Sequence, residues 1–249
     1  MPANYAVRML RPIWQNEPLA IEMFRTEALL GQKVSHPHLA PVLAAYVVEP
    51  PRMLVMPWLD GASLAKHLSL GRRFDLPQAL WIARQTAEAL DALFTAGWIH
   101  GDVSPGNIHL APNGHVTLLD LSFARPKGAA HSAVDRVVMG TCNYVAPEQL
   151  RSKLAADIRS DIYSLGAVLY ELLSGRPPYI ARDLAELASL HLQSSPPDLG
   201  RLAPDLPREI LGLVRRMIAK DPLRRPQTPR ELVRELAALE IGVFSQRAL

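Results

Sequence analysis

The sequence predicts an α+β fold in which a small part with strands and one helix precedes a larger, mostly helical part. Apolar residues alternate over residues 5–10 and follow one another over residues 52–59, which is typical of strands. Between these segments, residues 18–34 carry apolar residues at helical spacing. Beyond residue 60, longer stretches follow the helical period, and no long linker interrupts them. We therefore expect a single domain.

The composition is that of a globular chain, with 249 residues of which 49% are hydrophobic and 20% charged. The net charge of +3 is small for this length and argues against a nucleic-acid partner. The single cysteine excludes a disulfide framework and is compatible with a reducing compartment. No apolar run approaches the ~18 residues needed to cross a bilayer. We expect a cytoplasmic protein with no transmembrane segment in this chain.

Capping and turn residues predict the elements of the larger part. An Asp-x-x-Gln capping box opens a helix over residues 76–96, and Gly97 suits its C-terminal cap. The Asn113-Gly114 pair between two apolar runs predicts a hairpin. Residues 160–173 are apolar around most of the helical circumference, so we expect a buried central helix there. Two further helices are expected over residues 207–220 and from 228 to about 239.

Three polar residues around the predicted hairpin indicate the type of reaction that this chain supports. Asp102 lies on the preceding loop, Asn107 opens the hairpin and Asp120 closes it, so Asn107 and Asp120 should be neighbours. An amide oxygen beside a carboxylate suits Mg²⁺, which shares phosphate oxygens with its protein ligands. Asp102 can accept the proton of a hydroxyl group. Each residue alone also fits a plain turn or cap role, but the whole set at this spacing predicts phosphoryl transfer.

Four segments extend this prediction, namely HGDVSPGN at 100–107, DLS at 120–122, GTCNYVAPE at 140–148 and the SDIYSLG helix from 160. They resemble the catalytic loop H-R-D-L-K-P-x-N, the D-F-G motif, the G-T-x-x-Y-x-A-P-E end of the activation segment and the central helix of protein kinases. The chain therefore resembles a bacterial eukaryotic-type (Hanks-type) serine/threonine protein kinase domain. The resemblance covers almost the whole chain.

The resemblance implies a two-lobed, protein-kinase-like α+β fold. A truncated, β-rich N-lobe with the hinge would occupy residues 1–59, and a complete, mostly helical C-lobe residues 60–241. Residues 242–249 would form a tail. With few strands in the N-lobe, an open sheet edge at the first strand becomes a candidate place for self-association.

The resemblance also implies catalytic roles, with ATP and Mg²⁺ as cofactors and protein serine or threonine hydroxyl groups as acceptors. Asp102 would orient the acceptor hydroxyl and take its proton, while Asn107 and Asp120 would hold Mg²⁺ on the ATP phosphates. Ser104 stands where a lysine would touch the γ-phosphate, and Thr141 would line the substrate side of the catalytic loop.

Four residues are expected around adenine by the same resemblance. Met56 would be the gatekeeper, and Pro57 and Leu59 would offer a hinge carbonyl and a hinge amide to adenine. His109 falls where an apolar side chain would form the adenine floor, so it either stacks on adenine or is a partly exposed strand residue.

Two further contacts would support the active site. Glu148 would form an ion pair with Arg225, which would fix the end of the activation segment. Asp161 would hold the backbone of the catalytic loop.

The N-terminal segment departs from the family pattern. Arg8 stands in YAVR where the family has the phosphate-binding lysine of V-A-I-K, and Glu27, nineteen positions later, matches its glutamate partner. Arginine keeps the charge, but its planar fork differs from an ammonium. Only seven residues precede Arg8, which leaves no room for the family's Gly-rich loop. Either the protein lacks this loop or its start lies further upstream.

Three functions stay open at this level. The first is an active serine/threonine kinase, favoured by the three retained polar residues Asp102, Asn107 and Asp120. The second is a pseudokinase that acts as a binding or scaffold module, favoured by Arg8, Ser104 and the absence of a Gly-rich loop from this sequence. The third is a small-molecule phosphotransferase, whose loop is similar to H-G-D-x-x-x-x-N. The long activation segment and the SDIYSLG helix argue against the third.

Overall fold

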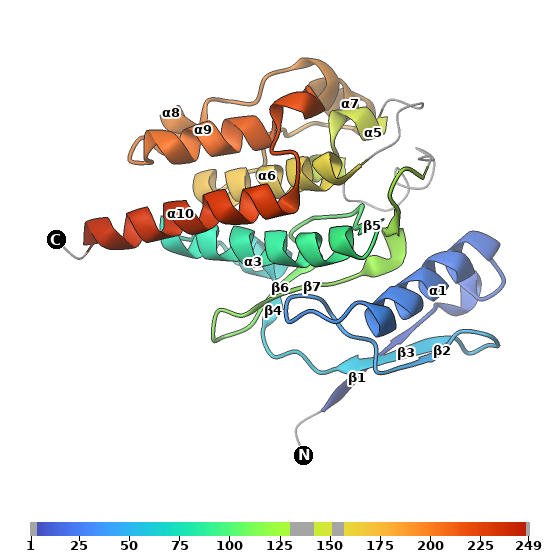
Figure 1. Cartoon of the computed structure of the whole chain (residues 1–249). Helices are drawn as coiled ribbons and strands as arrows, with labels where there is room; N and C mark the ends of the chain where they lie inside the picture. Colours follow the sequence, from blue (N-terminus) through green and yellow to red (C-terminus); the bar gives the residue numbers. More distant parts are fainter. Residues whose placement is uncertain (1–3, 130–141, 151–156, 248–249) are drawn as a thin grey trace.

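The computed structural model of the chain describes residues 4–129, 142–150 and 157–247. Two lobes are stacked in Figure 1, with a strand-containing lobe below a helical lobe. The N-lobe contains β1 (Tyr5–Met9), η1 (Pro12–Trp14), α1 (Pro18–Lys33), β2 (Ala44–Tyr46) and β3 (Met53–Pro57). The C-lobe follows with β4 (Ala62–Ser63), α2 (Leu64–Ser69), α3 (Leu76–Thr95), β5 (Trp98–Ile99), β6 (Ile108–Leu110), β7 (Val116–Leu118), η2 (Leu121–Phe123), β8 (Arg125–Pro126), η3 (Cys142–Tyr144), α5 (Pro147–Leu150), α6 (Ile158–Ser174), α7 (Leu184–Gln193), α8 (Leu199–Leu202), α9 (Arg208–Met217), η4 (Pro222–Arg224) and α10 (Pro229–Arg247).

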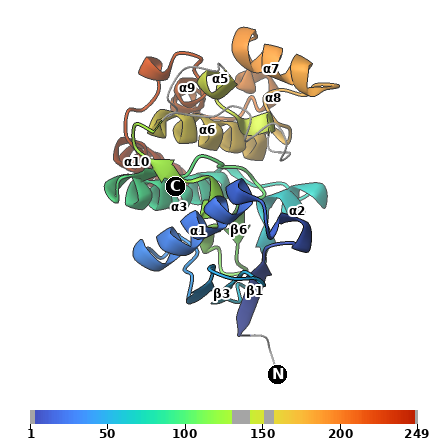
Figure 2. The same cartoon turned by 90° about the vertical axis from the view of Figure 1, so that its right-hand side faces the viewer.

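The N-lobe sheet is antiparallel with the order β1-β3-β2, and α1 lies beside it (Figure 2). A small apolar core joins α1 to this sheet, formed by Phe24, Ala28, Val42 and Leu54. Successive side chains of β1 alternate between the two faces of the sheet, and residues at odd positions are exposed while Arg8 is only partly exposed. This alternation points Arg8 to the side of the sheet where α1 packs.

The C-lobe core is built around the central helix α6. Asp157 caps its N-terminus, and Gly175 ends it with a φ of 79°, a conformation that glycine adopts without strain. The helix α3 has the predicted capping box between Asp75 and Gln78. In both views α10 runs alongside α3 (Figures 1 and 2). No helix of the described part of the chain is long and apolar enough to cross a membrane.

Two small sheets place the polar residues of the predicted site. The hairpin of β6 and β7 turns at Gly114, whose φ is 83°, as the Asn-Gly pair predicts. Strand β5 pairs with β8, and the segment 100–107 lies between β5 and β6. This segment and the residues that follow β7 are therefore held at one end of the hairpin.

The last helix is longer than expected. The sequence predicts an end near residue 239, but α10 continues to Arg247. The extra turns are stabilised because Glu240 is 8% exposed and accepts from Arg84 of α3 at 2.9 Å. Local capping rules cannot predict an ion pair between residues of two different helices. The helix expected over 207–220 is shorter, as α9 (Arg208–Met217). The predicted boundary between the C-lobe, ending at residue 241, and a tail stays a prediction.

Candidate active site

The loop that carries Asp102 is held by Asp161 of α6. The two carboxylate oxygens of Asp161 accept from the backbone nitrogens of His100 at 2.7 Å and Gly101 at 2.8 Å. The His100 ring is fully buried, and its Nε2 lies 3.0 Å from the carbonyl oxygen of Leu119. Its Nδ1 accepts from the backbone nitrogen of Asp102 at 3.1 Å. The expected role of Asp161 in holding the loop is thus seen in its contacts.

Asn107 connects the loop to the hairpin. Its Nδ2 donates to the backbone oxygen of Asp102 at 2.8 Å and to Oδ2 of the same residue at 2.7 Å. Its backbone oxygen accepts from the nitrogen of Leu119 at 2.7 Å, and its backbone nitrogen donates to the oxygen of Ser104 at 3.0 Å. These contacts use the amide nitrogen, whereas a metal ion would bind the amide oxygen. Ser104 itself is 3% exposed.

Asp120 follows β7 in a left-handed backbone conformation, with a φ of 59° and a ψ of 81°. This conformation is uncommon for residues other than glycine, although aspartate tolerates it better than most residues do. Its Oδ1 accepts from the nitrogen of Ser122 at 3.2 Å and from the hydroxyl of Ser122 at 2.6 Å. One carboxylate oxygen is thereby fixed by the turn, and Oδ2 faces the N-lobe.

Arg8 joins the two lobes at this point. Its Nη1 donates to Oε1 of Glu27 at 2.5 Å, and its Nη2 donates to Oδ2 of Asp120 at 2.9 Å. The predicted pairing with Glu27 is present, and a second ion pair across 112 residues accompanies it. The planar guanidinium makes both contacts at once because its terminal nitrogens point in different directions.

The two carboxylates that contact Arg8 have opposite pKa shifts. Glu27 is 2% exposed, and burial raises its pKa to about 7 although Arg8 acts in the other direction. Burial would also raise the pKa of Asp120, but Arg8 and the hydrogen bonds from Ser122 outweigh it and lower the pKa below its usual value. For Arg8, the two carboxylates outweigh burial and raise its pKa. Asp120 is therefore an anion at neutral pH.

The donor set at this site suits Mg²⁺ in its chemistry. Asn107 and Asp120 offer an amide oxygen and a carboxylate, both hard oxygen ligands. Within residues 4–129, 142–150 and 157–247, no group of three or more histidine, cysteine, aspartate or glutamate side chains forms a metal site. A two-ligand site matches the way Mg²⁺ binds, since phosphate oxygens and waters complete its coordination. The Oδ2 of Asp120, however, already has the guanidinium of Arg8 as its partner.

Comparison with known proteins identifies the family. The protein kinase domain family matches residues 4–236. The chain belongs to the protein kinase family. The chain is 34% identical to the serine/threonine-protein kinase PknA of Mycobacterium tuberculosis, over 95% of this chain and 55% of that protein. It is 32% identical to the serine/threonine-protein kinase PknB of Mycolicibacterium smegmatis, over 96% of this chain and 39% of that protein.

A third relative is the probable serine/threonine-protein kinase PknB of Lactococcus lactis, with 28% identity over 93% of this chain and 37% of that protein. The chain therefore spans between 37% and 55% of the length of these relatives. The predicted resemblance to bacterial Hanks-type serine/threonine kinases is confirmed, as is the two-lobed α+β fold. Kinases of this family in general use ATP and Mg²⁺.

The residues expected at the hinge lie at the end of β3 and just after it. Met56 packs against the N-lobe core, and Pro57 ends β3 opposite Tyr5. Leu59 and His109 line a hollow of about 400 Å³. The Nε2 of His109 lies 3.0 Å from the backbone oxygen of Asp60. This contact favours the partly exposed strand residue over the adenine floor for His109.

The predicted ion pair between Glu148 and Arg225 is present and buried. The Arg225 nitrogens Nη1 and Nη2 donate to the two oxygens of Glu148 at 2.6 Å and 2.8 Å. Ser160 of α6 donates to the same carboxylate at 2.7 Å. The side chain of Arg225 is fully buried and that of Glu148 is 8% exposed. The end of the activation segment is thus fixed to α6 and to η4. Thr141, just before this part, lies outside the described residues.

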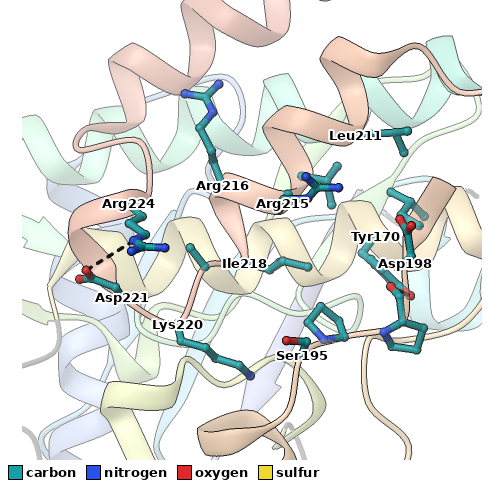
Figure 3. Close-up of a pocket in the computed structure, with 15 residues that line it drawn as sticks. Tyr170, Ser195, Asp198, Leu211, Arg215, Arg216, Ile218, Lys220, Asp221 and Arg224 are labelled. Carbon is teal, nitrogen blue, oxygen red and sulfur yellow. Dashed lines mark hydrogen bonds and ion pairs between the residues drawn. The ribbon is translucent and has the colours of Figure 1, made fainter.

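A separate cavity of about 580 Å³ lies in the C-lobe between α6, α8 and α9 (Figure 3). Three of its four cationic groups have partners within the lobe. Arg224 lies 4.0 Å from Asp221, and Lys220 donates to the backbone oxygen of His191 at 2.5 Å. Arg216 forms an ion pair with Glu235. None of the residues that line this cavity belongs to the predicted catalytic set.

Two contacts of the site were not predicted from the sequence. The hydroxyl of Ser122 donates to Asp120, a contact that the resemblance to D-F-G does not imply. A serine two residues after an aspartate is a local signal that can reveal such a turn. The contact between Arg8 and Asp120 has no local signal, because it depends on how the two lobes meet.

Proposed function

We propose that this kinase domain transfers the γ-phosphate of ATP to serine or threonine hydroxyl groups of proteins, with Mg²⁺ as cofactor. One observation carries the proposal most strongly. Asn107 holds both the backbone and the carboxylate of Asp102, and Asp161 holds the backbone on which Asp102 sits. A general base needs this kind of fixed position within reach of the hydroxyl group. An eroded site would not need to keep all of these contacts.

The transfer forms a bond between the acceptor oxygen and the γ-phosphorus. It breaks the bond from that phosphorus to the bridging oxygen, so ADP leaves. Asp102 orients the hydroxyl and takes its proton. Asn107 and Asp120 would hold Mg²⁺, which when bound neutralises charge on the phosphates. We assign Thr141 to the substrate side of the loop and Ser104 to its internal support.

The nucleotide would bind between the lobes. We assign Met56 as gatekeeper, with the carbonyl of Pro57 and the amide of Leu59 directed to adenine, and His109 at the border of the adenine site. Arg8 would contact the phosphates while Glu27 holds it from α1. The hydrogen bond of 2.5 Å between Arg8 and Glu27 supports this assignment.

The setting of the protein is part of the proposal. We infer that the domain acts on protein substrates. We also infer a cytoplasmic location, since ATP is available there. We further infer that two copies of the chain associate through β1. In the described part of the chain this strand pairs only with β3, so its other edge is open. Tyr5, Val7 and Met9 of this strand are 61%, 55% and 55% exposed. Sedimentation velocity across a range of concentrations tests this, and a monomer at all concentrations contradicts it.

A pseudokinase is the second candidate function. The ion pair between Arg8 and Asp120 favours it, because it engages a carboxylate that the reaction needs. A small-molecule phosphotransferase fits less well. The buried pair of Glu148 and Arg225 fixes an activation segment against α6, which forms a platform for a protein substrate.

Phosphate transfer tests the proposal directly. The purified chain is incubated with labelled ATP, Mg²⁺ and a generic protein substrate such as casein. Asp102→Asn should lower the transfer rate by ~10²-fold or more, the usual contribution of a general base. The same substitution at the exposed Asp205 serves as the control. Unchanged transfer by Asp102→Asn refutes the assigned role, and nucleotide binding without any transfer favours the pseudokinase.

A further inference from the structure

We propose that the C-lobe cavity of Figure 3 binds a fatty acid, a single alkyl chain that ends in a carboxylate, with Arg215 as the partner of the carboxylate. The cavity of about 580 Å³ has the size of a small-molecule site. Its lining combines an apolar wall with an excess of positive charge, which are the two features that such a ligand requires. The inference uses none of the catalytic residues, so it does not depend on the proposed function.

The apolar wall is held open by the chain itself. The hydroxyl of Tyr170 donates to the backbone oxygen of Pro197 at 2.9 Å, and the hydroxyl of Tyr179 donates to the backbone oxygen of Ser194 at 2.7 Å. Two tyrosines thus fix both ends of the segment 194–197, and its prolines restrict the backbone further. Because the wall is already in place, a ligand does not have to order it on binding. The apolar lining is formed by Tyr170, Pro196, Pro197, Leu199, Leu211 and Val214.

This wall suits an alkyl chain better than a peptide. The hydroxyl of Tyr170 is used on Pro197, and Asp198 accepts from the backbone nitrogen of Gly200 at 3.0 Å. A peptide needs partners for its backbone N–H and C=O groups once they leave water. An alkyl chain needs none, and it gains free energy simply by leaving water.

The charged groups of the cavity leave one positive charge in excess. Arg216 is paired with Glu235, and Arg224 lies 4.0 Å from Asp221. When Glu235 is counted, three carboxylates accompany four cations, so the site favours a ligand with one negative charge. The charged residues of the lining are Arg215, Arg216, Lys220, Arg224, Asp198 and Asp221.

Arg215 is the cation that remains for the ligand. Within the described part of the chain its side chain has no hydrogen bond or ion pair. Figure 3 shows it between Arg224 with Asp221 at one end of the cavity and Leu211 with Tyr170 at the other. A ligand along this direction has its carboxylate beside a guanidinium and its chain on the apolar wall. The planar guanidinium can donate two parallel hydrogen bonds to one carboxylate.

Lys220 adds to the positive potential without being free to bind. Its Nζ donates to the hydroxyl of Tyr179 at 2.6 Å and to the backbone oxygens of Leu190 and His191 at 3.2 Å and 2.5 Å. All of these acceptors are neutral. Burial and the nearby Arg225 lower the pKa of Lys220 to about 8, as expected for an ammonium group whose charge is poorly compensated. An anion in the cavity would supply part of this compensation.

Equilibrium dialysis of the whole chain against labelled decanoate tests the inference. One equivalent should bind per chain. Decanol keeps the alkyl chain without the charge, and acetate keeps the carboxylate without the chain, so each should compete at least about fivefold less well than unlabelled decanoate. At about ten times its dissociation constant, decanoate should also raise the melting temperature by about 3–6 °C.

Two variants separate the contribution of the charge from that of the wall. Arg215→Met should weaken decanoate binding about fivefold, since it removes the charge and keeps the apolar stem. Arg208→Met is the matched control, because it makes the same change on α9 outside the cavity lining and should leave the affinity unchanged. Leu211→Gln makes the wall polar at a half-buried position and should also weaken binding about fivefold or more.

The opposite results overturn the proposed site. Equal competition by decanol and decanoate, or equal affinities of wild type and Arg215→Met, contradicts the role of Arg215. Uptake of several equivalents, an unchanged affinity in Leu211→Gln, or no binding of decanoate shows that the cavity is not a fatty-acid site. None of these measurements involves phosphate transfer, so each of these outcomes leaves the proposed function as it stands.

Discussion

Replacing Arg225 by methionine should destabilise the domain far more than the same change at its neighbour Arg224. The guanidinium of Arg225 is fully buried, and Nη1 also donates to the backbone oxygen of Arg159 at 2.8 Å. Its Nε donates to the oxygen of Ala219 at 2.8 Å. Arg225→Met keeps much of the apolar stem but leaves the carboxylate of Glu148 buried, with only Ser160 as a partner among the contacts described above.

The magnitude follows from this burial. Breaking a buried ion pair by removing one partner costs about 3–5 kcal/mol, because the other charge stays uncompensated. For a chain of this size each kcal/mol corresponds to roughly 2–4 °C in melting temperature. Arg225→Met should therefore melt about 6–20 °C lower than wild type. Arg224 is 82% exposed and lies 4.0 Å from Asp221, so Arg224→Met should cost about 0–1 kcal/mol.

Differential scanning calorimetry of both variants at one pH and one salt concentration measures this difference. The double variant Arg225→Met with Glu148→Met removes both charges, and it should recover part of the lost stability. If Arg225→Met melts within about 2 °C of Arg224→Met, then the buried pair does not stabilise the activation segment as argued here. If the double variant is no more stable than Arg225→Met, the cost does not arise from the isolated carboxylate.

Two further predictions concern stability. Gly166→Ala should destabilise the domain by about 1–3 kcal/mol, since its Cβ would lie 2.6 Å from Cβ of Met217. Gly212→Ala in the open part of α9 should instead stabilise it by about 0.5–1 kcal/mol, and denaturant melts that give both changes the same sign contradict this. The pKa of Glu27 is about 7 in the folded chain and 4.5 ordinarily, so protonation of Glu27 favours the folded state. This contribution to the free energy of unfolding is complete below pH 4.5 and is lost as the pH rises through about 7. Glu27→Gln should remove this part of the pH dependence, measured as melting temperature across that range, and an identical profile would refute it.

Local chemistry made much of the fold predictable. The capping box at Asp75 and Gln78 defines the start of α3, and the Asn113-Gly114 pair defines the turn between β6 and β7. These signals act within a few residues, so they need no tertiary context. The end of α10 was not predictable in this way, because it depends on the contact between Glu240 and Arg84 of another helix.

In the candidate site, too, some contacts were predictable from the sequence and one was set by tertiary packing. The sequence alone determined which residues approach one another around the hairpin, since the spacing of Asp102, Asn107 and Asp120 within one loop and one hairpin leaves little choice. Only the tertiary structure decided that Arg8 contacts Asp120 as well as Glu27. The physical reason is that this contact joins two lobes across 112 residues, and the direction of a guanidinium is set by the charges that packing brings within its reach.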